Sequence, residues 1–305
     1  MKTIVFGIGG VGGFFGGMLA KTYAGKTNHE VHFIARGYHL ENMKRLGLKL
    51  KYNSDEYVIH PTSASSDVSG LPEADLILVT TKSYDLSGIL PSLKKVSNEQ
   101  TVILPLQNGL ENSDVLGSAH LPGILCDGLV YVGSEIESPG VIKTIGATQK
   151  LIFGVEGKIN ERLKSIEEYL SVAGFQVVLT DKPLKYKWVK FQFIGALSAV
   201  TARHQKTVGE VLGDTKLKSD YLTIMDEISK VAKAKGIDFP DNATQKSLEI
   251  AERMGFEQTT SFQRDYVAGK NNELEAYLGK FISEANLTKI SIPVSEKYYQ
   301  ELKNK

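Results

Sequence analysis

The chain has 305 residues, of which 42% are hydrophobic and 23% are charged, and this composition excludes a wholly disordered or fibrous protein. A chain of this length more often forms two domains than one. Its 36 basic and 35 acidic residues leave a net charge of +1, which excludes the strongly basic surface of a nucleic-acid-binding protein.

The first part of the chain alternates strand patterns with helix patterns. Short apolar runs predict strands at residues 3–6, 30–35, 75–80, 101–104 and 175–179, and periodic patterns predict helices at 11–23, 86–96 and 159–173. Strands separated by helices predict crossover connections, and therefore a doubly wound, mostly parallel sheet that is covered on both faces.

Two further segments of this part depart from that alternation. Residues 130–155 form short β-like runs around Pro139-Gly140, which predicts an antiparallel hairpin at the edge of the sheet. The serine-rich stretch 62–69 predicts a loop.

The pattern changes after Asp181, where strand-forming residues become rare. Helical periodicity appears at residues 185–202, 221–235, 244–254, 273–285 and 294–303. Asp214 and Asp241 stand where N-cap residues are expected. We therefore predict two domains, an α/β domain over residues 1–180 and an all-α domain over residues 181–305.

A glycine-rich motif follows the first predicted strand. It matches G-x-G-x-x-G, with the residues Gly7, Ile8, Gly9, Gly10, Val11 and Gly12. In a strand–turn–helix context these glycines permit a tight turn and close approach of the backbone to a pyrophosphate, which the helix N-terminus attracts. The motif predicts a Rossmann-like dinucleotide-binding domain, and the alternative is a glycine-rich packing turn without a ligand.

The end of the second strand indicates which dinucleotide is bound. NAD enzymes carry an acidic residue there, whereas NADP enzymes often use arginine for the 2′-phosphate. This strand ends in Arg36, with no acidic residue at its carboxyl end. A charge-assisted contact from arginine to phosphate contributes about 1.5–3 kcal/mol, so we predict NADPH. The alternative for Arg36 is a solvated surface residue.

Polar residues follow the next two strands. Lys82 comes after the third strand and Asn108-Gly109 after the fourth. Ligands of doubly wound sheets lie outside the carboxyl ends of the strands, so we expect Lys82 and Asn108 to face one crevice. A surface lysine and an Asn-Gly turn are the alternatives.

The helical part has two segments that combine polar and apolar residues. Lys190 lies in an aromatic segment after Trp188, where it is either a partly desolvated acid or a lysine whose amine reaches solvent from a core helix. The second segment runs from Ser261 through Asp265 to Glu273, and its charges could equally form a solvated helix face.

Taken in order, these features resemble the ketopantoate reductase (2-dehydropantoate 2-reductase) family. They are the glycine turn with Arg36, Lys82, Asn108-Gly109, Pro139-Gly140, Trp188-x-Lys190, and Ser261-x-x-x-Asp265 with Glu273. The resemblance implies NADPH-dependent reduction of 2-dehydropantoate to pantoate, on the route to pantothenate and coenzyme A. It also implies a Rossmann domain, a helical substrate domain and a cleft between them.

The resemblance also implies roles for individual residues. Lys190 corresponds to the catalytic lysine, and Glu273 to its acidic partner, which also contacts the cofactor. Asn108 corresponds to a residue at the nicotinamide end that contacts both cofactor and substrate, and Ser261 to a contact of the substrate carboxylate. As general acid, Lys190 would protonate the ketone oxygen, since hydride transfer leaves negative charge there. Burial would lower the pKa of Lys190, and Glu273 would raise it.

Two cofactor contacts complete the implied site. Lys82 corresponds to a lysine near the cofactor, and Ser134 to a residue whose backbone contacts it. Both belong to the predicted dinucleotide-binding domain.

Three positions depart from the family pattern. The family has asparagines that hold the substrate where this chain has Ile194, Ser198 and Val208. We retain Ser198 as a substrate contact, on the helix face of Lys190 at i+8. Lost donors change which substrate is accepted. The alternatives are therefore a reductase of another 2-keto or 3-keto acid, and a non-catalytic NADP(H)-binding sensor, against which the Lys190–Glu273 pair argues.

The remaining sequence features concern metals, location and assembly. The single cysteine, Cys126, excludes an intrachain disulfide and indicates a reducing, cytoplasmic setting. The six histidines lack metal-site spacing, so we predict no metal. We expect no membrane or nucleic-acid partner, and the family resemblance with apolar helices in the second domain predicts a homodimer.

Overall fold

The protein, seen in a computed structural model that describes residues 1–304, divides into two compact units. The first unit comprises Met1–Gln107 and Asn112–Pro183, and the second comprises Asn108–Glu111 and Leu184–Lys305. The division predicted at residue 180 did not include the short segment Asn108–Glu111 in the second unit. Its Leu110 is buried in the apolar core of that unit, which explains the departure.

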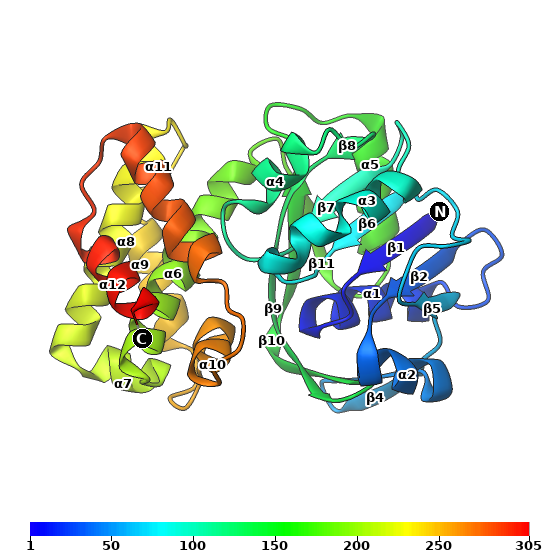
Figure 1. Ribbon diagram of the computed structural model, residues 1–305, viewed down its shortest axis with the longest axis horizontal. Coiled ribbons are helices and arrows are strands. Elements are labelled where there is room, and N and C mark those ends of the chain that lie inside the picture. The colour runs from blue at the N-terminus through cyan, green and yellow to red at the C-terminus, as the bar shows by residue number, and fades with distance from the viewer. Residues whose placement is uncertain (305) are drawn as a thin grey trace. The chain divides into compact units, whose positions relative to one another are not determined.

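A six-stranded parallel sheet forms the centre of the first unit (Figure 1). Its strands are β1 (Lys2–Phe6), β2 (Glu30–Ile34), β5 (Ser63–Ser65), β6 (Leu76–Val79), β7 (Val102–Pro105) and β8 (Ile124–Leu125). Their spatial order is β5-β2-β1-β6-β7-β8, and every neighbouring pair is parallel. This is the strand order of a doubly wound dinucleotide-binding sheet, and it confirms the predicted fold class.

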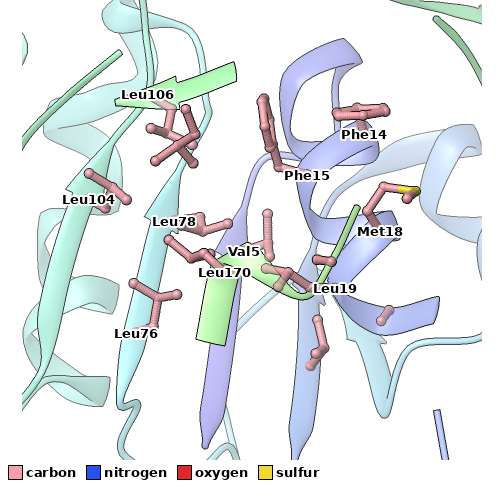
Figure 2. Packing of buried hydrophobic residues seen from close by; sticks show 14 of the residues in the cluster. Val5, Phe14, Phe15, Met18, Leu19, Leu76, Leu78, Leu104, Leu106 and Leu170 are labelled. Carbon is pink, nitrogen blue, oxygen red and sulfur yellow. The ribbon is translucent and has the colours of Figure 1, made fainter. Parts of the chain in front are cut away.

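Helices cover the sheet because alternate side chains of each strand point to opposite faces. The helices of this unit are α1 (Gly10–Thr22), α2 (Gly37–Leu46), η1 (Ser83–Asp85), α3 (Leu86–Val96), α4 (Asn112–Ser118) and α5 (Glu161–Ser171). Ile77 of β6 joins the apolar cluster of Leu93 in α3. The next residue, Leu78, joins the cluster of Leu19 in α1 and Leu170 in α5 (Figure 2). The core therefore lies on both faces, as predicted.

A second sheet packs on the far side of α1. Its strands are β3 (Leu48–Tyr52), β4 (Asp55–Ile59), β9 (Asp127–Ser138), β10 (Val141–Gly154) and β11 (Gln176–Leu179). The order is β11-β10-β3-β4, with β9 running antiparallel to β10. The predicted hairpin exists, but its predicted location at the edge of the first sheet was wrong. The strand predicted at 175–179 was also wrongly assigned to the first sheet. Both belong to this separate sheet.

Helix α1 fits between the two sheets because it carries small residues on both sides. A Cβ at Gly16 would lie 3.0 Å from Val5 of the first sheet, and one at Gly13 would overlap Ile142 of the second. Glycine has no Cβ, so both sheets approach the helix closely. This position holds the helix rigidly behind the glycine turn.

Two local predictions were wrong for identifiable reasons. The stretch 62–69, predicted as a loop, contains β5, because Ser63 pairs with His32 of β2 and extends the sheet by one strand. Asp241 is not an N-cap: it forms an ion pair with Lys233, and Asn242 occupies the cap position. The predicted cap at Asp214 is confirmed, since its carboxylate accepts the backbone N–H groups of the following turn.

The second unit is helical, as predicted. Its elements are α6 (Pro183–His204), α7 (Val208–Gly213), α8 (Thr215–Ala234), α9 (Ala243–Glu252), α10 (Ser261–Val267), η2 (Glu275–Gly279), α11 (Lys280–Thr288) and α12 (Pro293–Lys303). The buried amide of Gln192 in α6 donates to Ser229 of α8 and Thr244 of α9. This polar contact fixes α6 against its neighbours. No helix within residues 1–304 is long and apolar enough to cross a membrane.

Candidate functional site

The glycine turn connects β1 to α1 and leaves an open space at the helix N-terminus. Gly7 has a φ of +91°, and a Cβ there would lie 2.7 Å from the backbone nitrogen of Thr81. A Cβ at Gly9, by contrast, would meet no atom within 4 Å. The Thr80 hydroxyl donates to the carbonyl oxygens of Phe6 at 2.9 Å and Gly7 at 2.5 Å, which fixes the turn against β6.

The residues around this turn fit a bound phosphate. No side chain of the described part of the chain caps the N-terminus of α1, so its first N–H groups and its positive dipole end remain for an anion. The Thr81 and Ser134 hydroxyl oxygens are buried and have no hydrogen-bond partner within residues 1–304. A Cβ at Gly10 would overlap the carbonyl oxygen of Ser134, so β9 brings Ser134 directly against the turn.

Arg36 follows β2 and has an acidic neighbour that the sequence did not indicate. Its side chain is 79% exposed, and Nη2 donates to Oδ2 of Asp85 at 2.6 Å. Asp85 ends the short helix η1, whose N-cap position is Lys82. The guanidinium is therefore accessible to an anion, but a carboxylate shares it.

The candidate catalytic residues of the second unit lie together. Nζ of Lys190, on α6, donates to Oδ1 of Asn108 at 2.6 Å. Burial lowers the pKa of Lys190 to about 8, and the negative charge of Glu273 opposes that shift. Glu273 is itself buried. The site therefore contains an amine that exchanges a proton near neutral pH, beside an amide and a carboxylate.

The segment after Glu273 explains how Asn108 is held. It is the π-helix η2, a wider turn that often occurs at functional sites. A Cβ at Gly109, where φ is +96°, would lie 2.9 Å from the carbonyl oxygen of Ala276. Only glycine lets the Asn108 turn approach η2 this closely. Burial raises the pKa of Tyr277 well above its usual value, and the negative charge of Glu273 adds to that shift, so this tyrosine stays neutral.

The expected substrate residues also belong to the second unit. Ser261 begins α10 and is partly buried. Ser198 is 1% exposed, and its hydroxyl has no hydrogen-bond partner in the described chain. Val208 is fully buried in the apolar core, against which Ile194 packs. Because Asn108 and Lys82 belong to different units, their expected common crevice stays a prediction.

Three residues of interest were missed from the sequence: Asp85, Gln107 and Tyr277. Gln107 follows β7 and is 8% exposed; its position after a predicted strand was a signal that could have identified it. Tyr277 lies one helical turn after Glu273, which was a similar signal. No signal in the sequence indicated the pairing of Asp85 with Arg36, since 49 residues separate them. Within residues 1–304 no group of three or more His, Cys, Asp or Glu side chains could hold a metal ion.

The doubly wound sheet, its glycine turn and the helical unit define a class, the oxidoreductases built on a dinucleotide-binding fold. Residues 3–157 match the family described as ketopantoate reductase PanE/ApbA, and residues 184–305 match its C-terminal counterpart. The chain belongs to the ketopantoate reductase family.

Individual relatives cover almost the whole chain at modest identity. The chain is 28% identical to a 2-dehydropantoate 2-reductase of Pyrococcus horikoshii, over 97% of this chain and 94% of that protein. It is 26% identical to the uncharacterized oxidoreductase YkpB of Bacillus subtilis, over 99% and 98%. Among solved structures, a PanE/ApbA family ketopantoate reductase from Ralstonia eutropha aligns with a TM-score of 0.90 and 29% identity, over 100% of this chain and 98% of that one.

Proposed function

We propose that this protein reduces 2-dehydropantoate to pantoate with NADPH. The observation that carries the proposal is the Lys190 amine, held by Asn108 at 2.6 Å and partly desolvated so that its pKa is about 8. A group with a pKa near the working pH is an effective general acid. The family membership of the chain supports the reaction type.

The first unit would hold the cofactor. The open N-terminus of α1 would take the pyrophosphate, the exposed Arg36 guanidinium the 2′-phosphate, and Lys82 and Ser134 would contact the same molecule. Bound NADPH supplies a hydride to the ketone carbon of the substrate.

The second unit would supply the proton. Lys190 donates a hydrogen bond to the ketone oxygen, which becomes negative as the carbon accepts hydride, and then transfers its proton to that oxygen. Asn108 orients the amine through its Oδ1. The negative charge of Glu273 keeps a larger fraction of the amine protonated. Ser261 and Ser198 would contact the substrate.

The test is NADPH oxidation, followed by absorbance, with 2-dehydropantoate and a panel of 2-keto acids. Turnover of 2-dehydropantoate with NADPH in preference to NADH is expected. Lys190→Ala should lower kcat by at least about 10²-fold, the usual loss for a general acid, with little change in NADPH affinity. Normal turnover by this variant would refute the role of Lys190. Tight NADPH binding without turnover of any keto acid would favour a sensor.

A second candidate, reduction of a different 2-keto acid, is favoured by one observation. Ile194 and Val208 stand where the family resemblance implies substrate-holding asparagines, and neither aliphatic side chain can donate a hydrogen bond to a polar substrate. Both belong to the apolar packing of the second unit. A higher kcat/KM for a keto acid with an apolar side chain than for 2-dehydropantoate would select this candidate.

The pathway and assembly follow from the same proposal. We infer a role in pantothenate biosynthesis in the cytoplasm, and a homodimer. Sedimentation equilibrium checks the dimer: twice the chain mass of 33.5 kDa is expected, and a stable monomer at micromolar concentration would contradict it.

A further inference from the structure

The side chain of Gln107 is buried, and its carboxamide is unpaired within residues 1–304. It is 8% exposed, and neither its Nε2 nor its Oε1 has a hydrogen-bond partner among the described residues. Leaving a buried donor or acceptor unpaired is costly, and here both ends of one carboxamide are unpaired. Such a group indicates a partner that the polypeptide itself does not provide.

The sheet places Gln107 on one particular side of the glycine turn. The preceding residue, Leu106, donates its N–H to the carbonyl oxygen of Val79 at 2.9 Å, so the chain is still paired with β6 as it leaves β7. Strand β6 lies next to β1, while Arg36 follows β2 on the opposite side of β1. Gln107 and Arg36 therefore stand at opposite sides of the turn along the carboxyl edge of the sheet.

This placement separates the two halves of a dinucleotide. With the pyrophosphate at the N-terminus of α1, the two nucleosides extend in opposite directions across the point where the strand order reverses. Arg36 lies on the side of β2, which is the side for the adenosine 2′-phosphate. The side of β6 and β7, with Thr81 and Gln107 at the strand ends, then belongs to the nicotinamide nucleoside.

The chemistry of Gln107 selects one group on that nucleoside. A primary carboxamide offers donors on nitrogen and an acceptor on oxygen. A ribose hydroxyl donates and accepts through one oxygen, whereas a second primary carboxamide carries its donor and its acceptor on two atoms and can pair with both ends of Gln107 through two hydrogen bonds. We propose that Gln107 binds the carboxamide of the nicotinamide ring and so fixes which face of the ring is presented. This inference rests on the proposed use of NADP(H).

The test compares cofactors that differ at one group, by equilibrium binding rather than turnover. The ligands are NADPH, its 3-acetylpyridine analogue, in which a methyl group replaces the amide NH₂, and 2′,5′-ADP, which lacks the nicotinamide nucleoside. Gln107→Leu removes both hydrogen bonds at similar size. It should weaken NADPH by about tenfold, as expected for loss of hydrogen bonds, weaken the analogue clearly less, and leave 2′,5′-ADP unchanged.

Matched variants keep the result interpretable. Thr81→Val removes another unpaired buried hydroxyl at the neighbouring strand end and should leave the ratio of NADPH to analogue affinity unchanged. Gln107→Met, which is unbranched, replaces the leucine variant if that variant fails to fold. Equal weakening of NADPH and its analogue, or no weakening of either, would overturn the assignment of Gln107. The binding measurements require no catalysis, so absence of keto-acid turnover would contradict only the proposed function. Absence of NADPH binding by the unmodified protein would contradict both the proposed function and the assignment of Gln107.

Discussion

At the scale of single residues, the lowered pKa of Lys190 predicts a pH dependence. The amine must be protonated to act as an acid, so kcat/KM for keto-acid reduction should be constant below its pKa of about 8 and fall as the pH rises above it. Glu273→Gln removes the charge that raises this pKa, and the falling limb should then move to lower pH. Profiles of kcat/KM against pH at saturating NADPH locate the falling limb of the unmodified protein and that of the variant. The same falling limb in both proteins would argue against coupling between Lys190 and Glu273.

The pairing of Arg36 with Asp85 gives a second residue-scale prediction. A 2′-phosphate and the Asp85 carboxylate would both draw on one guanidinium, so Asp85→Asn should tighten NADPH binding by about twofold to fivefold, the usual range for an exposed pair. Arg36→Ala should weaken NADPH by about 1.5–3 kcal/mol. NADH affinity is the control for both variants and should hardly change. Weaker NADPH binding by the Asp85 variant would show that the carboxylate orients Arg36 rather than competing for it.

Individual residues differed in how far the sequence could identify them. The glycine turn was predictable because its spacing encodes a local shape, and the structure has it between β1 and α1 as expected. Asn108 was selected by its place after a predicted strand, and Lys190 was a candidate acid because of its aromatic segment. Their catalytic roles, and Glu273 as the acidic partner, came only from the family resemblance, and the contact between Lys190 and Asn108 spans 82 residues. Gln107 follows a predicted strand, so a local signal for it existed. The pairing of Asp85 with Arg36 depends on which segments become neighbours, and no local pattern carries that information.

At the scale of elements, two adjacent glycines at the start of α1 should respond oppositely to substitution. Gly9→Ala adds a methyl group where nothing lies within 4 Å, so thermal stability should be unchanged while NADPH affinity falls by about tenfold or more, because the methyl would occupy the phosphate space. Gly10→Ala would overlap the Ser134 backbone and should destabilise the protein by about 1–3 kcal/mol, as overpacking does. Urea denaturation and NADPH titration separate the two effects. Unaltered NADPH binding by the Gly9 variant would contradict the assignment of the pyrophosphate to this turn.

Element prediction succeeded for the short apolar strands of the first sheet and missed β3 and β4 of the second. The buried strands β1, β6 and β7 are short, mostly apolar segments, and their length and flanking turn residues indicate strands that are covered on both faces. Strand β3 alternates the buried Leu48 and Leu50 with Lys49 and Lys51, which is a strand pattern that the sequence analysis missed. Both lysines pair with Glu56 of β4. Strand β3 pairs with β4 next to it in the chain and with β10 about 90 residues further along. The pairing with β10 joins the β3–β4 pair to the rest of the second sheet.

At the scale of the whole molecule, Cys126 can report opening of the first unit. It lies between β8 of one sheet and β9 of the other, is 1% exposed, and burial raises the pKa of its thiol. A disulfide reagent at pH 8 should therefore leave the native protein unlabelled and modify one thiol per chain in denaturant. Saturating NADPH should slow labelling at intermediate urea, since a ligand stabilises the folded state. Fast labelling of the native protein would show that the segment between β8 and β9 opens readily. The Cys126→Ser variant, which has no thiol, is the control for background labelling.

The four residues Asn108–Glu111 limit how the molecule can be recombined with its relatives. They are encoded within the first half of the chain but complete the core of the helical half, where Leu110 is buried and Gly109 fits against Ala276. A chimera cut only near residue 183 would graft a helical half onto a foreign tetrapeptide. Exchange of substrate preference between homologues therefore calls for a two-part transplant, in which this insert travels with the helices.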